Sequence, residues 1–332
     1  MKSLDLAALL NVPDMPSCLA QVEHEIMRAL DDKPGPLRVP LQRLLQVRGK
    51  RLRPALVIAS ARACGAAVNE RVIGAAAAVE LLHIASLVHD DIIDRAATRW
   101  NVPTISEREG VDAAILAGDF LFAKACARAA AVDGEVAALL AHAFAFLSAA
   151  EAQEAADQYN PERTRDSLDQ VLHDKTARLL GAACQIGGIC AGATKTQQRA
   201  LARYGEAFGM VFQYADDVLD FLADPALLGK PIGTDVRDGV YTLPLLLGLE
   251  SEHGARLRPL LTPAVNPADV TKILLQTDVF DRSIAAARTH AAHASKALVT
   301  FTPSAVRAAL QEFPQAYLDW SLATLTGDPS KY

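Results

Sequence analysis

The stretch that decides the fold is "NERVIGAAAAVELLHIASLVHDDII", residues 69–93, which is apolar on nearly every side and ends in carboxylates. A helix that is apolar all round lies in the interior of a protein. The stretch therefore predicts a central, buried helix. Asp90 and Asp94 fall one helical turn apart, so the two carboxylates share a face at the end of this helix.

The rest of the chain carries the same signals of helix, because alanine and leucine are abundant and apolar residues recur at intervals of three and four. Ser17 is a possible N-cap of the first helix, and the helix at 166–192 is expected to loosen near Gly187 and Gly188. Residues 224–244 are expected to be a long non-helical loop. We predict an all-α bundle that forms a single domain over residues 1–332. The expected helices are 17–32, 52–66, 69–93, 112–132, 134–160, 166–192 and 197–223.

Composition excludes several classes of protein. The 332 residues carry a net charge of −6 without a block of Lys or Arg, so nucleic acid is not an expected partner. The five cysteines include no CxxC pair, which is typical of a reducing compartment, and we expect a cytoplasmic protein. The N-terminus lacks the pattern of a signal peptide. No stretch has the length of an uncharged membrane span, so no stable span is expected.

A second acidic cluster, "QYADDVLD", occupies residues 213–220. Asp216 and Asp220 share a helix face, and Gln213 precedes Asp216 by one turn. Each cluster taken alone is typical of a solvated acidic helix end. Two clusters embedded in apolar helix instead favour bound cations, because buried carboxylates are costly without neutralisation. Hard oxygen ligands favour Mg²⁺, which commonly bridges carboxylates to phosphates.

Basic residues that could bind phosphate lie before, between and after the two clusters. Lys50 and Arg53 lie in "GKRLRP", at the start of a helix whose amides also attract anions. His83 lies two turns before Asp90, where a hydrogen-bonded core histidine is the ordinary interpretation. Each of these residues alone is also compatible with a surface or core role without function. The remaining candidates are Arg99, Lys175, Thr176 and Lys230.

Taken in order, these motifs resemble those of the trans-prenyltransferases, the isoprenyl (polyprenyl) diphosphate synthases. The resemblance implies a bundle of long helices around one deep central cavity, usually in a homodimer. It implies about three Mg²⁺ ions, an allylic prenyl diphosphate and isopentenyl diphosphate as ligands. The motifs that carry the resemblance are "GKRLRP" (49–54), "ELLHIASLVHDDIID" (80–94), "LAGDF" (116–120), "KTARLLGAAC" (175–184), "FGMVFQYADDVLD" (208–220) and "GKPIGTDVRDG" (229–239).

The resemblance also implies a role for each matching residue. Asp90, Asp94 and Asp216 would hold Mg²⁺, and Asp220 is a weaker candidate for the same role. The three stronger metal ligands and Lys175 would be the catalytic groups. Residues matching contacts to the allylic diphosphate are Arg99, Lys175, Thr176, Gln213 and Lys230. Residues matching contacts to isopentenyl diphosphate are Lys50, Arg53 and His83.

The reaction implied is ionisation of the allylic diphosphate and attack on the resulting cation by the double bond of isopentenyl diphosphate. Each cycle would add five carbons. Ala85 and Ser86, one turn before Asp90, would line the path of the growing tail. Both are small, which favours an all-trans product of C20 or longer.

Two positions depart from the family pattern, since Trp100 and Val240 stand where basic residues are usual, and the short basic ending of some members is missing. Three hypotheses follow. The chain is an ordinary elongating synthase; or it ionises an allylic diphosphate and transfers the cation to another acceptor, as a terpene cyclase does; or it is a non-catalytic subunit that binds prenyl diphosphate. Outside the family, "HD" at His89 and Asp90 also occurs in all-helical phosphohydrolases, which would leave the second acidic cluster unexplained.

Overall fold

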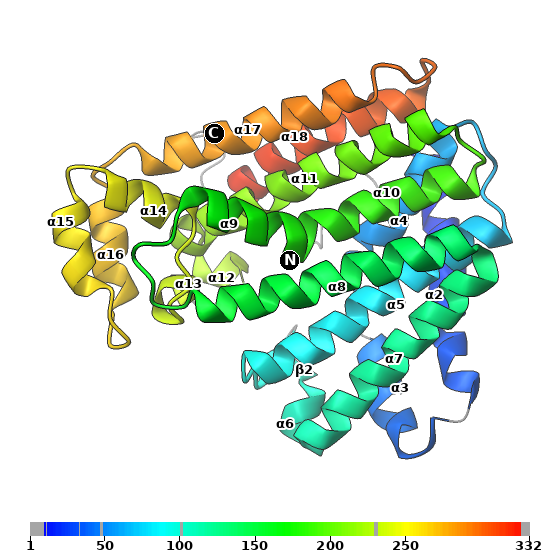
Figure 1. The fold of residues 1–332 in the computed structure, drawn as a ribbon, viewed down its shortest axis with the longest axis horizontal. Helices are drawn as coiled ribbons and strands as arrows, with labels where there is room; N and C mark the ends of the chain where they lie inside the picture. Colours follow the sequence, from blue (N-terminus) through cyan, green and yellow to red (C-terminus); the bar gives the residue numbers. More distant parts are fainter. Residues whose placement is uncertain are drawn as a thin grey trace.

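The computed structural model describes residues 10, 12–32, 34–46, 49–99, 102–228 and 232–326, without the side chains of residues 226, 228 and 325. It confirms the all-α prediction: apart from a hairpin of two-residue strands, β1 (Thr98–Arg99) and β2 (Val102–Pro103), the regular structure described is helical (Figure 1). The α-helices are α2 (Met15–Met27), α3 (Arg38–Gln46), α4 (Leu52–Ala63), α5 (Glu70–Ile93), α6 (Ile105–Glu109), α7 (Val111–Val132), α8 (Gly134–Ala156), α9 (Arg165–Leu172), α10 (Arg178–Cys190), α11 (Lys195–Leu222), α12 (Pro225–Leu228), α13 (Thr234–Arg237), α14 (Leu243–Glu250), α15 (Gly254–Leu257), α16 (Pro267–Leu274), α17 (Val279–Ala297) and α18 (Ala305–Leu325). Shorter turns are the 3₁₀ segments η1 (Arg28–Asp32), η2 (Gly35–Leu37) and η4 (Arg258–Leu260), and the π-helical turn η3 (His173–Ala177).

Helix α5 is the central helix that the sequence predicts. Asn69 caps it by accepting a hydrogen bond of 3.1 Å from the amide of Val72. The four alanines at 75–78 are fully buried, and α5 packs against α2, α4, α7 and α10. Because alanine side chains are short, neighbouring helices approach α5 closely and hold its acidic end in a fixed place.

The π-helical turn η3 joins α9 to α10 and carries the sequence "HDKTA". It packs against α8 on one side and α11 on the other. Gly209 of α11 allows this approach, because a Cβ atom there would lie 2.4 Å from the Cα of Ala177. The turn is therefore held between two long helices that run beside α10 (Figure 1).

Several predicted boundaries are wrong. Asp14 rather than Ser17 precedes the first helix, which ends at Met27 before a 3₁₀ segment. The helix predicted at 166–192 is interrupted at His173–Ala177 and stays regular at Gly187 and Gly188. At Gly187 the glycine is needed for packing, since a Cβ atom would lie 2.2 Å from the carbonyl oxygen of Val57.

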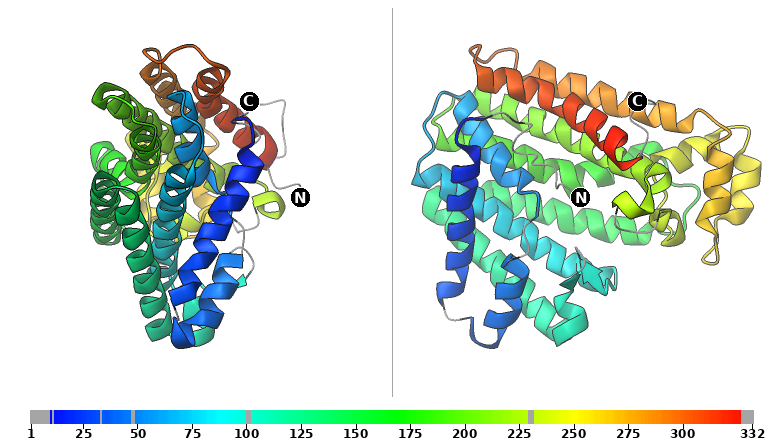
Figure 2. Two further views of the ribbon diagram at one scale, coloured as in Figure 1. Left: turned by 90° about the vertical axis from the view of Figure 1, so that its right-hand side faces the viewer. Right: turned by 180° about the vertical axis from the view of Figure 1, so that it is seen from behind.

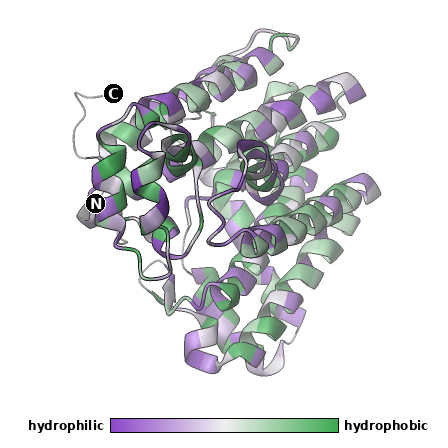
Figure 3. Cartoon of the chain, turned by 60° about the vertical axis from the view of Figure 1, so that its left-hand side comes forward, coloured by the Kyte–Doolittle hydropathy of each residue, from purple (hydrophilic) through white to green (hydrophobic). Residues whose placement is uncertain are grey.

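The remaining helices cover the bundle. Residues 224–244, predicted as loop, contain the short helices α12 and α13. Helices α14, α15 and α16 pack together at one end, and α17 and α18 cover the back of α11 (Figure 2). Hydrophobic and hydrophilic residues alternate along most helices, as expected for elements that bury one side (Figure 3).

Two helices, α5 and α8, are long and apolar enough to cross a membrane by length and composition. This differs from the prediction that no stretch would qualify. In α5, 83% of the apolar window is buried inside the protein, as in the core helix of a globular bundle, whereas in α8 only 28% is buried. The exposed apolar surface of α8 therefore needs its own explanation.

Candidate active site

The first row of carboxylates stands at the C-terminal end of α5, which is the negative end of the helix dipole. Asp90 is half-buried; burial, reinforced by the Glu151 carboxylate, raises the pKa of Asp90 from its ordinary 3.8 to about 7. Burial also raises the pKa of Asp94, the C-cap residue of α5. In both cases the nearby Lys175 and Arg99 lower the pKa but do not offset burial and the neighbouring carboxylates, and a bound cation would favour the ionised form of both groups.

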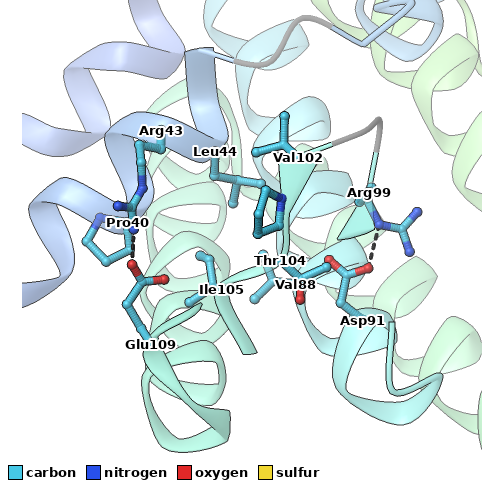
Figure 4. Close-up of a pocket in the computed structure, with 11 residues that line it drawn as sticks. Pro40, Arg43, Leu44, Val88, Asp91, Arg99, Val102, Thr104, Ile105 and Glu109 are labelled. Atoms are coloured by element: carbon cyan, nitrogen blue, oxygen red, sulfur yellow. Dashed lines mark hydrogen bonds and ion pairs between the residues drawn. The ribbon is translucent and has the colours of Figure 1, made fainter. Parts of the chain in front are cut away.

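The third carboxylate of this cluster has a different partner. Asp91 is buried and accepts a hydrogen bond of 2.6 Å from the Nε of Arg99 on β1. The two side chains face each other at a small cavity between α3, α5 and the hairpin (Figure 4). Arg99, predicted to bind the allylic diphosphate, is thus held beside the acidic row by Asp91, which is not one of the predicted metal ligands.

The second row lies on α11. Asp216 is exposed, and Gln213, one turn earlier, is half-buried. Asp217 is buried and accepts a hydrogen bond of 3.4 Å from the amide of Leu243; burial raises its pKa well above the ordinary value. Asp216 is the carboxylate of this row that reaches solvent. A ligand to a metal ion that also binds a substrate from solution needs such access.

Asp220, the last carboxylate of the second row, is 1% exposed. It accepts hydrogen bonds from the Thr234 hydroxyl at 2.7 Å and from the Asp235 amide at 3.2 Å. Its carboxylate therefore orders the start of α13, directly after the segment that contains Lys230. Its role as a metal ligand stays a prediction, and Lys230 itself lies outside the described residues, as does Trp100.

Lys175 projects from the π-helical turn toward α8. Its Nζ lies 2.5 Å from Glu154 Oε1 and 3.0 Å from Glu151 Oε1. Burial alone would lower the pKa of Lys175, but the two carboxylates more than reverse this effect, so the pKa is raised. Thr176, the next residue, is buried. In the structure described here Lys175 is thus already neutralised by two acidic residues that the sequence analysis did not identify.

Glu154 also relates the two rows to each other. Burial is the largest cause of the raised pKa of Asp94 on α5 and of Asp217 on α11. The Glu154 carboxylate makes a smaller contribution to each shift. A residue of each row therefore lies within electrostatic range of Glu154 on α8, which also pairs with Lys175. That the two rows face one shared space stays a prediction.

The predicted isopentenyl diphosphate residues come together at a cavity of about 230 Å³. The Nε atom of Arg53 is buried without a hydrogen-bond partner, and burial lowers the pKa of Arg53. Burial, followed by the nearby Arg53 guanidinium, lowers the pKa of His83 well below its ordinary value. Burial likewise lowers the pKa of Lys50, an effect that Asp216 opposes. A lysine and an arginine that line one cavity, the arginine with a buried Nε that lacks a hydrogen-bond partner, suit the binding of an anion.

Arg51 fixes the backbone between Lys50 and Arg53. It is the N-cap residue of α4 and adopts a left-handed conformation with φ 48° and ψ 34°, which costs a non-glycine residue about 1 kcal/mol or more. Its buried guanidinium donates to Glu80 of α5 at 2.9 Å and to Glu23 of α2. Arg51 therefore pairs with both carboxylates, and Lys50 and Arg53, on either side of it, stay available to bind a ligand.

A groove of about 400 Å³ begins at Asp90 and runs between α5 and α8. Ser86 lines it, whereas Ala85 is fully buried in the core and is not part of its wall. Phe144 of α8 also lines it and stacks on Phe122 of α7 with ring centroids 4.5 Å apart. The side chains that line the groove are Ser86, His89, Asp90, Ile93, Phe144, Leu147, Ser148, Glu151, Ala152 and Ala155.

The donors present fit a hard divalent cation. Asp90, Asp94 and Asp216 offer only carboxylate oxygens, and burial raises the pKa of the first two despite the nearby Lys175 and Arg99. Among the described residues, no three His, Cys, Asp or Glu side chains gather closely enough to hold a metal alone. A cation here would complete its shell with water and a phosphate ligand, which is the usual way that proteins bind Mg²⁺.

Comparison with known proteins identifies the class to which this fold and site belong. The polyprenyl synthetase family model matches residues 35–277, so the chain belongs to this family. It is therefore a prenyltransferase.

Individual relatives agree with this assignment. The chain is 36% identical to heptaprenyl diphosphate synthase component 2 of Geobacillus stearothermophilus over 80% of this chain and 84% of the relative. It is 36% identical to nonaprenyl diphosphate synthase of Mycobacterium tuberculosis over 77% of each chain. A polyprenyl synthase from Caulobacter crescentus, solved with calcium and isoprenyl diphosphate, superposes with a TM-score of 0.86 at 28% identity, covering 94% of this chain and 97% of that one.

Proposed function

We propose that the chain is a Mg²⁺-dependent enzyme that condenses an allylic prenyl diphosphate with isopentenyl diphosphate and releases a longer all-trans prenyl diphosphate. The observation that carries the proposal is that the cavity lined by Lys50, Arg53 and His83 lies close to carboxylates of both acidic rows. Arg53 lies close enough to Asp90, and Lys50 to Asp216, for each carboxylate to oppose the lowered pKa of the cation. Two diphosphates could therefore bind side by side, one through metal and one directly.

On the allylic side, Asp90, Asp94 and Asp216 would hold Mg²⁺, about three ions by analogy with the family. Bound Mg²⁺ would supply the positive charge that stabilises a departing diphosphate. Lys175 then donates hydrogen bonds to the diphosphate oxygens, with Glu151 and Glu154 holding its ammonium group at the edge of the acidic space. Arg99, fixed by Asp91, adds a second donor.

On the other side, Arg53, Lys50 and His83 bind the isopentenyl diphosphate and hold its double bond near the ionised carbon. Phe212 also lines this cavity, so the hydrocarbon part of the substrate has an apolar contact there. The walls exclude water, which would otherwise capture the allylic cation. The proton lost in the condensation would pass to the departed diphosphate.

The product is proposed to be C20 or longer. Near Asp90, the groove between α5 and α8 is lined by the small residues Ser86, Ser148 and Ala152, so a tail can pass. Phe144, backed by Phe122, is the aromatic side chain along α8 away from the acidic space that could stop it, one turn beyond Ser148 and next to Leu147. The relatives named above, heptaprenyl and nonaprenyl diphosphate synthases, make products in this range.

Two other functions have specific support. The missing basic residue at position 100 favours an enzyme that transfers the cation elsewhere, and the similarity to a protein named "component 2" favours a subunit that acts with a partner.

The deciding experiment incubates the protein with Mg²⁺, farnesyl or geranylgeranyl diphosphate and labelled isopentenyl diphosphate, and analyses products by mass. We expect labelled, longer prenyl diphosphates. Unchanged isopentenyl diphosphate with a hydrocarbon or alcohol product would establish another acceptor, and no consumption of either substrate would establish the subunit.

We also propose a cytoplasmic homodimer. Helix α8 is apolar but only 28% buried over its apolar window, and neighbouring α7 exposes Val111, Ile115 and Leu116. Exposed apolar surface of this extent usually marks an association surface, and a second copy of the chain is the proposed occupant. The five cysteines stand as free thiols, which suits a reducing compartment.

A further inference from the structure

Helix α18, the last helix that the structure describes, contributes an aromatic wall beside the cavity lined by Lys50, Arg53 and His83. The Nζ atom of Lys50 lies 5.6 Å from the centroid of the Trp320 ring. A cation within about 6 Å of an aromatic centroid is attracted by the negative face of the ring, and tryptophan is the strongest such partner. No sequence motif connects these residues, which are separated by most of the chain.

A second aromatic residue of α18 braces the same wall. The ring of Tyr317 is stacked on Phe212, with centroids 5.5 Å apart and an angle of 17° between planes, and Phe212 lines the cavity. Tyr317 is buried and lies 6.3 Å from Trp320, centroid to centroid. Helix α18 also packs against α4, which begins directly after Arg51, so Trp320 is held in place by the fold.

The partner of Lys50 differs in kind from those of the other cations around the site. Lys175 is paired with Glu151 and Glu154, and Arg51 with Glu80 and Glu23. A carboxylate partner offsets the charge of a cation and competes with a phosphate for its N–H donors. Within the part of the chain that the structure describes, Lys50 has no ion pair; an aromatic face orients its ammonium group without cancelling the charge.

We propose that Trp320 is a positioning residue for isopentenyl diphosphate: its indole holds the ammonium group of Lys50 at the cavity while leaving the full positive charge for the diphosphate. The inference rests on the proposed function for the identity of the ligand. A purely structural role for Trp320, as packing between α18 and α4, makes different predictions.

The test compares the single variants Trp320→Leu, Trp320→Phe and Lys50→Met with a double variant that combines Trp320→Leu and Lys50→Met. Binding of isopentenyl diphosphate is measured by calorimetry in chelator, without allylic substrate, so that the result does not depend on turnover. Trp320→Leu is expected to weaken binding about three- to thirtyfold, the range for loss of a cation–π contact, and Trp320→Phe to lose less. Phe120→Leu, which removes a similar contact with Lys124 at 5.3 Å on α7, is the control and should leave binding unchanged.

The double variant separates positioning from packing. If Trp320 acts through Lys50, Trp320→Leu adds little once Lys50 has been replaced by methionine; independent, additive losses would overturn the inference. Equal affinity of wild type and Trp320→Leu, or no binding by the wild type, would also overturn it. If Trp320→Leu does not fold, Trp320→Phe alone decides, because a ring that only packs would give unchanged affinity. Failure of the proposed function appears separately, as absence of chain elongation by a protein that still binds the ligand through Trp320.

Discussion

Substituting Asp90 by asparagine is expected to stabilise the metal-free protein, although it removes a predicted metal ligand. Burial, reinforced by Glu151, raises the pKa of Asp90 from 3.8 to about 7, so ionising this carboxyl in the folded state costs free energy. Fully expressed, that change amounts to about 4 kcal/mol above pH 7. Because the side chain is only half-buried, solvent screening reduces the expected gain to about 1–2 kcal/mol.

The effect on melting temperature follows from chain length. For 332 residues the unfolding entropy is about 0.7 kcal/mol per kelvin, so Asp90→Asn should melt about 1.5–3 °C above wild type in chelator at pH 8. The folded pKa lies above the unfolded one, so the cost of ionisation starts near pH 4 and is complete above about 7. The advantage of the variant should therefore fall to less than half at pH 5.

Scanning calorimetry in chelator tests the cost of ionising Asp90, and scanning calorimetry in Mg²⁺ tests its predicted role as a metal ligand. Mg²⁺ should raise the melting temperature of wild type, since a ligand stabilises the state that binds it, and should raise that of Asp90→Asn much less. Glu252→Gln removes a carboxylate whose side chain is 90% exposed and should shift neither value. An Asp90→Asn protein that melts below wild type in chelator at pH 8, or that responds to Mg²⁺ as wild type does, would refute the account.

Two further predictions concern the product and the assembly. Phe144→Ala should shift the product distribution toward longer chains by at least one five-carbon unit, because it opens the end of the groove; Phe146→Ala, whose residue is 39% exposed, is the matched control. Products of unchanged length by mass spectrometry would place the floor elsewhere. Light scattering should give twice the 35.4 kDa mass of the chain, and Leu116→Glu, a change on exposed α7 surface, should shift it toward one chain. A monomer that binds vesicles would instead assign the apolar surface of α7 and α8 to a membrane.

The helices could be predicted because burial and periodicity are local signals. Residues 69–93 are apolar all round, and the observed helix differs from the predicted one by a single residue. The π-helical turn at His173–Ala177 could not be predicted, because its sequence contains neither glycine nor proline. It depends on contacts with α8 and with Gly209 of α11, which come from distant parts of the chain.

For the site, too, local sequence predicts some features, whereas others depend on contacts between distant parts of the chain. A lysine inside an apolar helix predicts an acidic partner, and Glu151 and Glu154 occur three residues apart in an alanine-rich helix. Nothing in the sequence says that this helix lies opposite Lys175, so the partners were missed. Trp320 was missed for the same reason, since its contact with Lys50 joins the last helix to the start of α4.

The unequal pairing of the cations implies that the two halves of the site form under different conditions. Arg53 and Lys50 line their cavity without an ion pair among the described residues, because Arg51 pairs with Glu23 and Glu80. Lys175, in contrast, is held against Glu151 and Glu154 beside the acidic row.

A cation bound at Asp90 and Asp94 would neutralise that row and would attract a diphosphate to the space beside Lys175. The lysine could then donate to a diphosphate oxygen as well as to its glutamates. Under the proposed function, the allylic half of the site would thus be completed only when metal and diphosphate bind, whereas the fold itself forms the cavity of Lys50, Arg53 and His83.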